Sequence, residues 1–181
     1  MALPSESQGY FENHGITVHY SGIGKVNAAV CTQILIDDFK AEVVINTGIA
    51  GSLNADINIG DIVVSTDLIH HDMNAVAFGY PVGQIPQMEA FSFHSDDALR
   101  TLAVKACKEA NPDIEVFEGR IASGDQFVAD QGVKDFITKE FGAYAVEMEG
   151  AAIAQAAYLN NVPFLVIRAI SDKADGSAEM D

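Results

Sequence analysis

The chain has 181 residues, with 26 acidic and 10 basic side chains and a formal net charge of −16 at pH 7. So acidic a chain is not expected to bind nucleic acids or anionic membranes, because both carry negative charge. Hydrophobic residues make up 49% of the sequence, which suits one domain with a substantial core. No apolar run approaches the roughly 18 residues of a membrane-spanning helix, so no membrane partner is expected.

The chain contains two cysteines, Cys31 and Cys107. They form neither a disulfide framework nor a metal-ligand spacing, so we expect no metal and no other cofactor. Such cysteine usage favours a reducing, cytoplasmic compartment.

The apolar periodicity predicts strands that alternate with helices, as in an α/β protein. The predicted strands span residues 15–20, 41–47, 61–66, 116–122, 144–146 and 164–172. The predicted helices span residues 26–39, 95–110, 131–141 and 150–158, and Ser95 is the expected N-cap of the second. Residues 1–8 match no element and are expected to be disordered, which leaves residues 9–181 as one α/β domain.

Glycine-containing turns follow several predicted strands. Gly22 and Gly24 precede the first predicted helix, where a tight turn is favoured over a phosphate site. Residues 48–53 follow a buried strand, as at the ligand-binding edge of an α/β sheet, although a turn alone would need the same glycines. Phe127 comes just after a Gly-Asp turn and is either a core anchor or a stacking platform for a flat ring.

The His70-His71-Asp72 sequence raises the question of a metal site. Adjacent side chains on an extended segment point to opposite faces, so the two histidines are not expected to bind one metal. The loop that follows, residues 74–86, is rich in aromatic residues, glycine and proline. It is predicted to be a lid or a subunit contact.

Two predicted strands end in carboxylates. Glu147 and Glu149 flank Met148 at the start of a predicted helix, and they either cap this helix or hold polar groups of a ligand. Ser171 and Asp172 end the last predicted strand. Because ligands bind beyond the carboxyl ends of strands in open α/β sheets, the two junctions together indicate one ligand site.

Six short motifs are combined in one order along the chain. They are Ser-Gly-Ile-Gly-Lys-Val from Ser21, Asn-Thr-Gly-x-Ala-Gly from Asn46, His-Asp-x-x-x-x-Ala-Phe-Gly-Tyr from His71, Ser-Gly-Asp-x-Phe from Ser123, Val-Glu-Met-Glu from Val146 and Arg-Ala-Ile-Ser-Asp from Arg168. Over residues 9–181 this order resembles the 5′-methylthioadenosine/S-adenosylhomocysteine nucleosidases of the nucleoside phosphorylase superfamily. The resemblance implies a three-layer αβα fold with a mostly mixed central sheet, a homodimer, and cleavage of adenine thionucleosides into adenine and a 5-thioribose.

The resemblance also implies the catalytic residues. Asp172 would be the general acid that protonates adenine N7, oriented by Ser171, and Glu149 would bind the ribose hydroxyls. Proton donation matters because adenine leaves poorly as an anion, and general acid catalysis is typically worth about 10²–10⁴-fold in rate. Carboxylates near the sugar stabilise the oxocarbenium-like transition state of glycoside cleavage.

The other substrate-binding residues that the resemblance implies surround the nucleoside. Adenine would be stacked on Phe127 and read by the backbone of Val128, and Met148 would pack beneath the sugar. The remaining members of the implied site are Ala50 and Gly51 around the base and ribose, Glu147 in a supporting role, and Phe78 and Pro86 in the 5′ pocket of the neighbouring subunit.

Three departures from the family pattern leave alternatives open. Residues 1–8 do not resemble the strand and acidic run that supply the family's water-activating glutamate, the closing helix is not recognised, and Ile49 stands where serine is frequent. The chain is therefore expected to be a shortened form, and a catalytically impaired nucleoside-binding module is one alternative. The other is a phosphate-dependent nucleoside phosphorylase, although neither Arg120 nor Arg168 lies in a recognisable phosphate-binding loop and Arg100 lies in a predicted surface helix.

Overall fold

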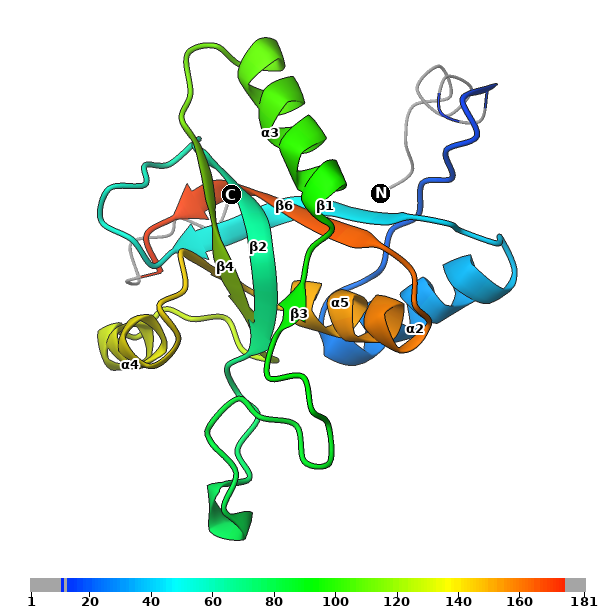
Figure 1. Ribbon diagram of the computed structural model, residues 1–181. Coiled ribbons are helices and arrows are strands. Elements are labelled where there is room, and N and C mark those ends of the chain that lie inside the picture. The colour runs from blue at the N-terminus through cyan, green and yellow to red at the C-terminus, as the bar shows by residue number, and fades with distance from the viewer. Residues whose placement is uncertain (1–10, 12, 175–181) are drawn as a thin grey trace.

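The computed structural model describes residue 11 and residues 13–174 (Figure 1). Its strands are β1 (Val44–Ser52), β2 (Ile62–His70), β3 (Phe93–His94), β4 (Val116–Ser123), β5 (Ala145–Glu147) and β6 (Phe164–Asp172). Its helices are α2 (Lys25–Asp37), the short 3-10 helix η1 (Val76–Phe78), α3 (Asp97–Ala110), α4 (Gln131–Phe141) and α5 (Gly150–Leu159). Within these residues, no helix has the length and apolar character needed to cross a membrane. The expected disorder of residues 1–8 concerns a segment outside the described residues.

The strands form one mixed sheet in the order β3-β2-β4-β5-β1-β6. The pairs β1–β6, β2–β4 and β4–β5 are parallel, whereas β1–β5, β2–β3 and β2–β6 are antiparallel. Because β6 pairs with both β1 and β2, the sheet curls until five of its strands form a ring. The mixed α/β architecture expected from the sequence is confirmed, and the ring brings the ends of strands that are distant in sequence close together.

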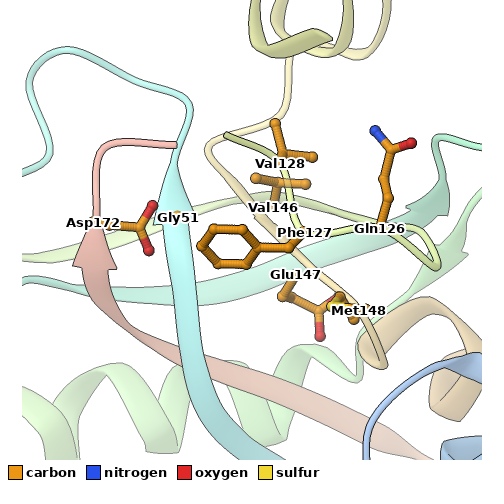
Figure 2. Close-up of a pocket in the computed structure, with 8 residues that line it drawn as sticks. All are labelled: Gly51, Gln126, Phe127, Val128, Val146, Glu147, Met148 and Asp172. Carbon is orange, nitrogen blue, oxygen red and sulfur yellow. The ribbon is translucent and has the colours of Figure 1, made fainter. Parts of the chain in front are cut away.

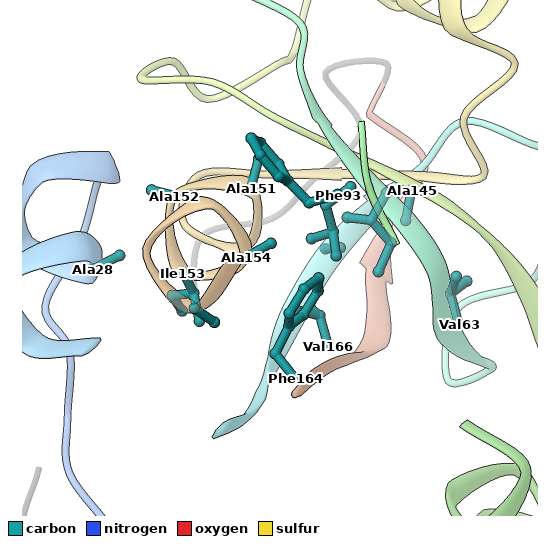
Figure 3. Packing of buried hydrophobic residues seen from close by; sticks show 14 of the residues in the cluster. Ala28, Val63, Phe93, Ala145, Ala151, Ala152, Ile153, Ala154, Phe164 and Val166 are labelled. Carbon is teal, nitrogen blue, oxygen red and sulfur yellow. The ribbon is translucent and has the colours of Figure 1, made fainter. Parts of the chain in front are cut away.

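Helix α5 fits closely onto the sheet because its inward face is built from alanine and glycine. Ala151, Ala154 and Ala157 are fully buried, and a Cβ added to Gly150 would lie 2.6 Å from Leu68 Cδ2. Figure 3 shows α5 between the sheet and α2, which contributes Ala28 to the same core. Small side chains on α5 therefore set how closely the β5–α5 junction approaches the strands.

The structure corrects several predicted boundaries. Residues 15–20 are not a strand, because an alternating pattern forms one only beside a pairing partner, and the described chain places none there. Strand β1 continues through the glycine-rich residues 48–52, because β5 and β6 pair with that end of it. The N-cap of α3 is Asp96 rather than Ser95, since the Asp96 side chain accepts a hydrogen bond from Leu99 N at 2.9 Å.

Two leucine-to-alanine substitutions, one in the core and one on the surface, test the importance of the core beneath α5. Leu68 is fully buried, whereas Leu102 on α3 is 65% exposed. Leu68→Ala is expected to lower the free energy of unfolding by about 2–5 kcal/mol, because it leaves a cavity. Leu102→Ala should change it by about 0.5 kcal/mol or less. Urea denaturation followed by circular dichroism measures both, and similar losses in the two variants would contradict this description of the core.

Candidate active site

A small cavity lies where the ends of β1, β5 and β6 meet the segment after β4 (Figure 2). Its volume is about 30 Å³. The lining residues are Gly51, Gln126, Phe127, Val128, Val146, Glu147, Met148 and Asp172. The two strand-end junctions predicted from the sequence to form one site therefore do share one cavity.

Asp172 supplies a buried carboxylate to this cavity. It is 6% exposed, and its Oδ2 accepts a hydrogen bond from Ser171 Oγ at 2.8 Å. Its Oδ1 accepts one from Ala174 N at 2.7 Å. A Cβ added to Gly51 would lie 2.9 Å from Oδ1, so glycine leaves the room that the carboxylate occupies.

A register shift in the β1–β6 ladder sets the direction of this carboxylate. Ala50 pairs with Ile170, but the next residue, Gly51, pairs with Asp172, so Ser171 is bulged out of the ladder. Asp172 is therefore buried opposite Gly51, whereas Ser171 is exposed and its hydroxyl reaches back to the Asp172 carboxylate.

Glu147 is buried and fully occupied by partners inside the protein. Its carboxylate forms an ion pair with Arg168, whose side chain is 2% exposed, and accepts a hydrogen bond from Ser123 Oγ. Its Oε2 also accepts hydrogen bonds from the backbone N–H of Glu149 at 3.1 Å and of Gly150 at 2.8 Å. Glu147 thus caps α5, as one interpretation of the sequence proposed, and it forms part of the cavity wall.

Glu149 does not cap its own helix but turns toward α2. Its Oε1 accepts a hydrogen bond from Gly24 N at 2.9 Å, and its side chain makes no capping hydrogen bond to α5. Burial raises the pKa of Glu149 above its ordinary value, as does the Glu147 carboxylate, while the Gly24 N–H and the Arg168 guanidinium oppose this rise. Glu149 lies beside the cavity rather than among the residues that line it.

The apolar residues implied by the family resemblance divide into two groups. Phe127, Val128, Met148 and Gly51 line the cavity, and Ala50 lies next to it, with its carbonyl accepting from Ser171 Oγ at 3.4 Å. Phe127 is 63% exposed, which excludes the core-anchor interpretation and leaves its ring open to a ligand.

Phe78 and Pro86 lie elsewhere, in the long loop after β2 that extends away from the sheet (Figure 1). Phe78 is 84% exposed, and neither residue reaches the cavity of its own chain.

Sequence reasoning missed the part played by Arg168 in this site. Its guanidinium donates to Asn46 Oδ1 as well as to Glu147, and it packs so closely on Gly48 that an added Cβ there would be 2.8 Å from Nη1. The available signal was a charged residue within a buried, otherwise apolar strand. Such a residue needs a buried partner of opposite charge.

Comparison with known proteins agrees with this fold. A family model described as the phosphorylase superfamily matches residues 6–181. A 5′-methylthioadenosine/S-adenosylhomocysteine nucleosidase of Bacillus licheniformis is 46% identical over 175 residues, which cover 96% of this chain and 75% of that protein.

Two solved structures from Helicobacter pylori superpose well on the chain. A mutant of its nucleosidase with 5′-methylthioadenosine in the active site gives a TM-score of 0.83 at 43% identity, and the match covers 88% of this chain and 68% of that one. The native structure of its futalosine hydrolase gives a TM-score of 0.85 at 42% identity, and the match covers 90% of this chain and 69% of that one. The fold thus defines a nucleoside-cleaving α/β protein of the phosphorylase superfamily. Within that superfamily, the chain belongs to the family of 5′-methylthioadenosine/S-adenosylhomocysteine nucleosidases.

The Glu147–Arg168 ion pair leads to a stability prediction with a matched control. Glu147→Gln leaves the Arg168 charge buried without a counter-charge, which should lower the free energy of unfolding by about 3–5 kcal/mol. Glu118→Gln removes the same group from an exposed pair with Arg100, in which the Glu118 side chain is 48% exposed, and should cost about 0–1 kcal/mol. Urea denaturation at neutral pH compares the two variants. Equal losses would show that the buried pair is not a major source of stability.

Proposed function

We propose that the chain hydrolyses the N-glycosidic bond of 5′-methylthioadenosine and S-adenosylhomocysteine, releasing adenine and a 5-thioribose. The observation that carries this proposal is the pairing of a buried carboxylate with an exposed aromatic ring across one cavity. Figure 2 shows Asp172 and the ring of Phe127 on either side of the strand end that carries Gly51. A purine stacked on Phe127 would present the nitrogen atoms of its edge to Asp172.

Each group at the cavity has a task in this reaction. Asp172 donates a proton to adenine N7 as the glycosidic bond breaks, so the base leaves neutral, and Ser171 holds its carboxyl group in place. Glu149 accepts hydrogen bonds from the ribose hydroxyls, which is consistent with a carboxylate that forms no ion pair among the described residues. Negative charge at Glu149 also favours the positive charge that develops on the sugar in the transition state.

The cavity has to widen before a nucleoside can enter. A volume of about 30 Å³ is roughly that of one water molecule, far below the ~300 Å³ of a small ligand pocket. The segment from Gly124 to Asp130 lies between β4 and α4 and has no helix or strand of its own. It carries Phe127, so a movement of this exposed side chain would open the cavity and let the ring lie on the purine.

The contacts at the start of α2 argue against the phosphorylase alternative. Helix N-termini attract anions such as phosphate, but here Gly24 N donates to Glu149 and Lys25 N donates to Asp125 Oδ1 at 2.8 Å. Carboxylates therefore occupy the position of an anion. Arg168, the arginine nearest the cavity, is already neutralised by Glu147. Adenine release that requires added phosphate would favour the phosphorylase, and adenine binding without any release would favour a binding module.

We propose, in addition, that the chain works as a homodimer in a reducing, cytoplasmic compartment. The loop after β2 exposes Phe78, and α2 exposes Val26 and Val30, at 84%, 73% and 53% respectively. Large apolar side chains exposed to this degree are typical of an interface. In a dimer, Phe78 and Pro86 of the loop would complete the 5′ pocket of the second subunit. Cys31 and Cys107 are both free thiols, consistent with a reducing environment.

The role of Asp172 is tested by Asp172→Asn. The variant should fold normally but lose about 10²–10⁴-fold in the rate of adenine release, because an amide cannot donate the proton that the leaving base requires. Asp113→Asn is the control and should keep the wild-type rate, because Asp113 is an exposed aspartate in the turn between α3 and β4. Steady-state kinetics with 5′-methylthioadenosine, beside circular dichroism spectra, measure both. A kcat near wild type in Asp172→Asn would refute the assignment.

The role of Glu149 is tested with a pair of ligands. A ligand that lacks the 2′-hydroxyl should bind about 10- to 100-fold more weakly than its ribose counterpart, because hydrogen bonds to a charged acceptor are worth about 1.5–3 kcal/mol. In Glu149→Ala this preference should largely disappear. Calorimetric titration of both ligands into both proteins gives the comparison, and an unchanged preference in Glu149→Ala would remove this residue from the ribose site.

A further inference from the structure

The His70-His71-Asp72 sequence, which begins at the last residue of β2, has no part in the reaction described above, yet it packs closely against the site. His70 Nε2 lies 2.9 Å from Gln155 Oε1 of α5, and a Cβ added to Gly124 would lie 2.4 Å from His71 Nε2. Both imidazoles are buried, which lowers their pKa values. They therefore pack as neutral rings against two elements of the site, and Asp72 is left to face α2.

Each carboxylate oxygen of Asp72 holds a different segment of the chain. Oδ1 forms an ion pair with Lys25 Nζ at 2.6 Å, in the first turn of α2. Oδ2 accepts a hydrogen bond from Asp125 N at 2.9 Å, in the segment that leads from β4 to Phe127. The Asp125 side chain in turn accepts from Lys25 N at 2.8 Å, so these contacts close a ring. We call the three residues Lys25, Asp72 and Asp125 the clasp.

The clasp lies directly beside the contact that holds Glu149. The residue before Lys25 is Gly24, whose N–H donates to Glu149 Oε1 at 2.9 Å. Gly24 has φ of +89°, and a Cβ added there would lie 3.1 Å from Asp125 Oδ1. The backbone at this point is thus confined by the clasp on one side and by Glu149 on the other.

From this geometry we propose that Asp72 is a positioning residue for the nucleosidase reaction. Through Lys25 it fixes the Gly24 amide that aims Glu149 at the ribose, and through the Asp125 amide it fixes the segment that carries Phe127. One side chain thereby sets the distance between the sugar-binding carboxylate and the base-stacking ring. The proposal rests on the proposed function, since it assigns Asp72 to that same site.

The state of the clasp supports this role at the pH of the reaction. Burial alone would raise the pKa of Asp72, but the hydrogen bonds from Lys25 and from the Asp125 amide outweigh it and hold the pKa below its ordinary value. The side chains of Lys25 and Asp72 are 19% and 26% exposed, so the pair is only partly screened by solvent. Asp72 therefore stays ionised in the range in which Glu149 titrates.

Glu149 provides a readout that a merely structural role would not change. The charged groups around it are Glu147 on β5 and Arg168 on β6, together with the Gly24 N–H at the start of α2. Loss of the Gly24 hydrogen bond removes an interaction that lowers the pKa of Glu149. That pKa then rises further, and the protonated form, which is an uncharged and weaker acceptor for the ribose hydroxyls, persists to higher pH. The acidic limb of kcat/KM should consequently move to higher pH when the clasp is broken.

The experiment measures adenine release from 5′-methylthioadenosine between about pH 4.5 and 8, the span in which carboxyl groups with raised pKa values titrate. It compares wild type with four single variants and with the Asp72→Asn/Lys25→Met double variant. Asp72→Asn and Lys25→Met each break the clasp, Lys25→Arg keeps its charge, and Glu118→Gln breaks an ion pair remote from the site. Thermal unfolding of every variant accompanies the kinetics.

We expect Asp72→Asn and Lys25→Met each to lower kcat/KM by about tenfold or more, because a lost hydrogen bond to a charged group has about this effect. We also expect both variants to move the acidic limb of kcat/KM to higher pH. The double variant should be little worse than either single one, because both break the same contact. Lys25→Arg should restore most of the activity, and Glu118→Gln should match wild type. Lys25 lies in the first turn of α2 and its side chain is partly exposed, so Lys25→Met decides the matter even where Asp72→Asn folds poorly.

Two different failures are distinguishable. Wild-type turnover with an unchanged acidic limb in both clasp variants would overturn the role of Asp72 and leave the proposed function standing. Absence of adenine release by the wild-type chain would overturn the proposed function, and the role of Asp72 with it.

Discussion

The buried ion pair between Glu147 and Arg168 is the interaction on which the rest of the site depends. Removing two charges from water is costly, and the cost is offset only when both groups are well satisfied. Here Glu147 also receives hydrogen bonds from Ser123 Oγ and from two backbone amides at the start of α5. The pair thus joins β4, β5, β6 and α5 at one point. Any other arrangement of these elements would leave a charge buried without its partner.

The same pair separates two tasks that neighbouring carboxylates could otherwise share. Glu147 is held by Arg168 and by the α5 amides, while Glu149, two residues on, forms no ion pair among the described residues. One carboxylate therefore organises the protein and the other remains available to a ligand. The pKa of Glu149 is raised by burial and by Glu147, so this carboxylate is more easily protonated than an exposed one.

The sequence predicted individual elements well wherever local chemistry determines them. Helix α4 begins and ends at the predicted residues because Asp130 caps its start and Gly142 adopts a left-handed conformation at its end. Glu147 and Asp172 were correctly placed at strand ends around one cavity, because the point at which a strand ends can be read from the residues next to it in sequence.

The closure of the sheet and the clasp were not predictable in this way. They join residues such as Lys25, Asp72 and Asp125, which are 47 to 100 positions apart, and no local pattern specifies such pairings. The error at residues 15–20 has the same origin, because alternation describes a strand's faces and not its partner. The roles assigned to Asp172, Glu149 and Phe127 come from the family resemblance and stay predictions.

The bulge at Ser171 has a consequence for how this site tolerates change. Side chains alternate across a strand, so Arg168, Ile170 and Asp172 face the interior together, and the extra residue in the ladder is what brings the last of them opposite Gly51. Most substitutions along β6 would leave that alternation intact. A deletion or insertion of a single residue between Arg168 and Asp172 would turn the carboxylate to the other face of the sheet. Across related chains, the length of this segment should therefore vary less than its composition.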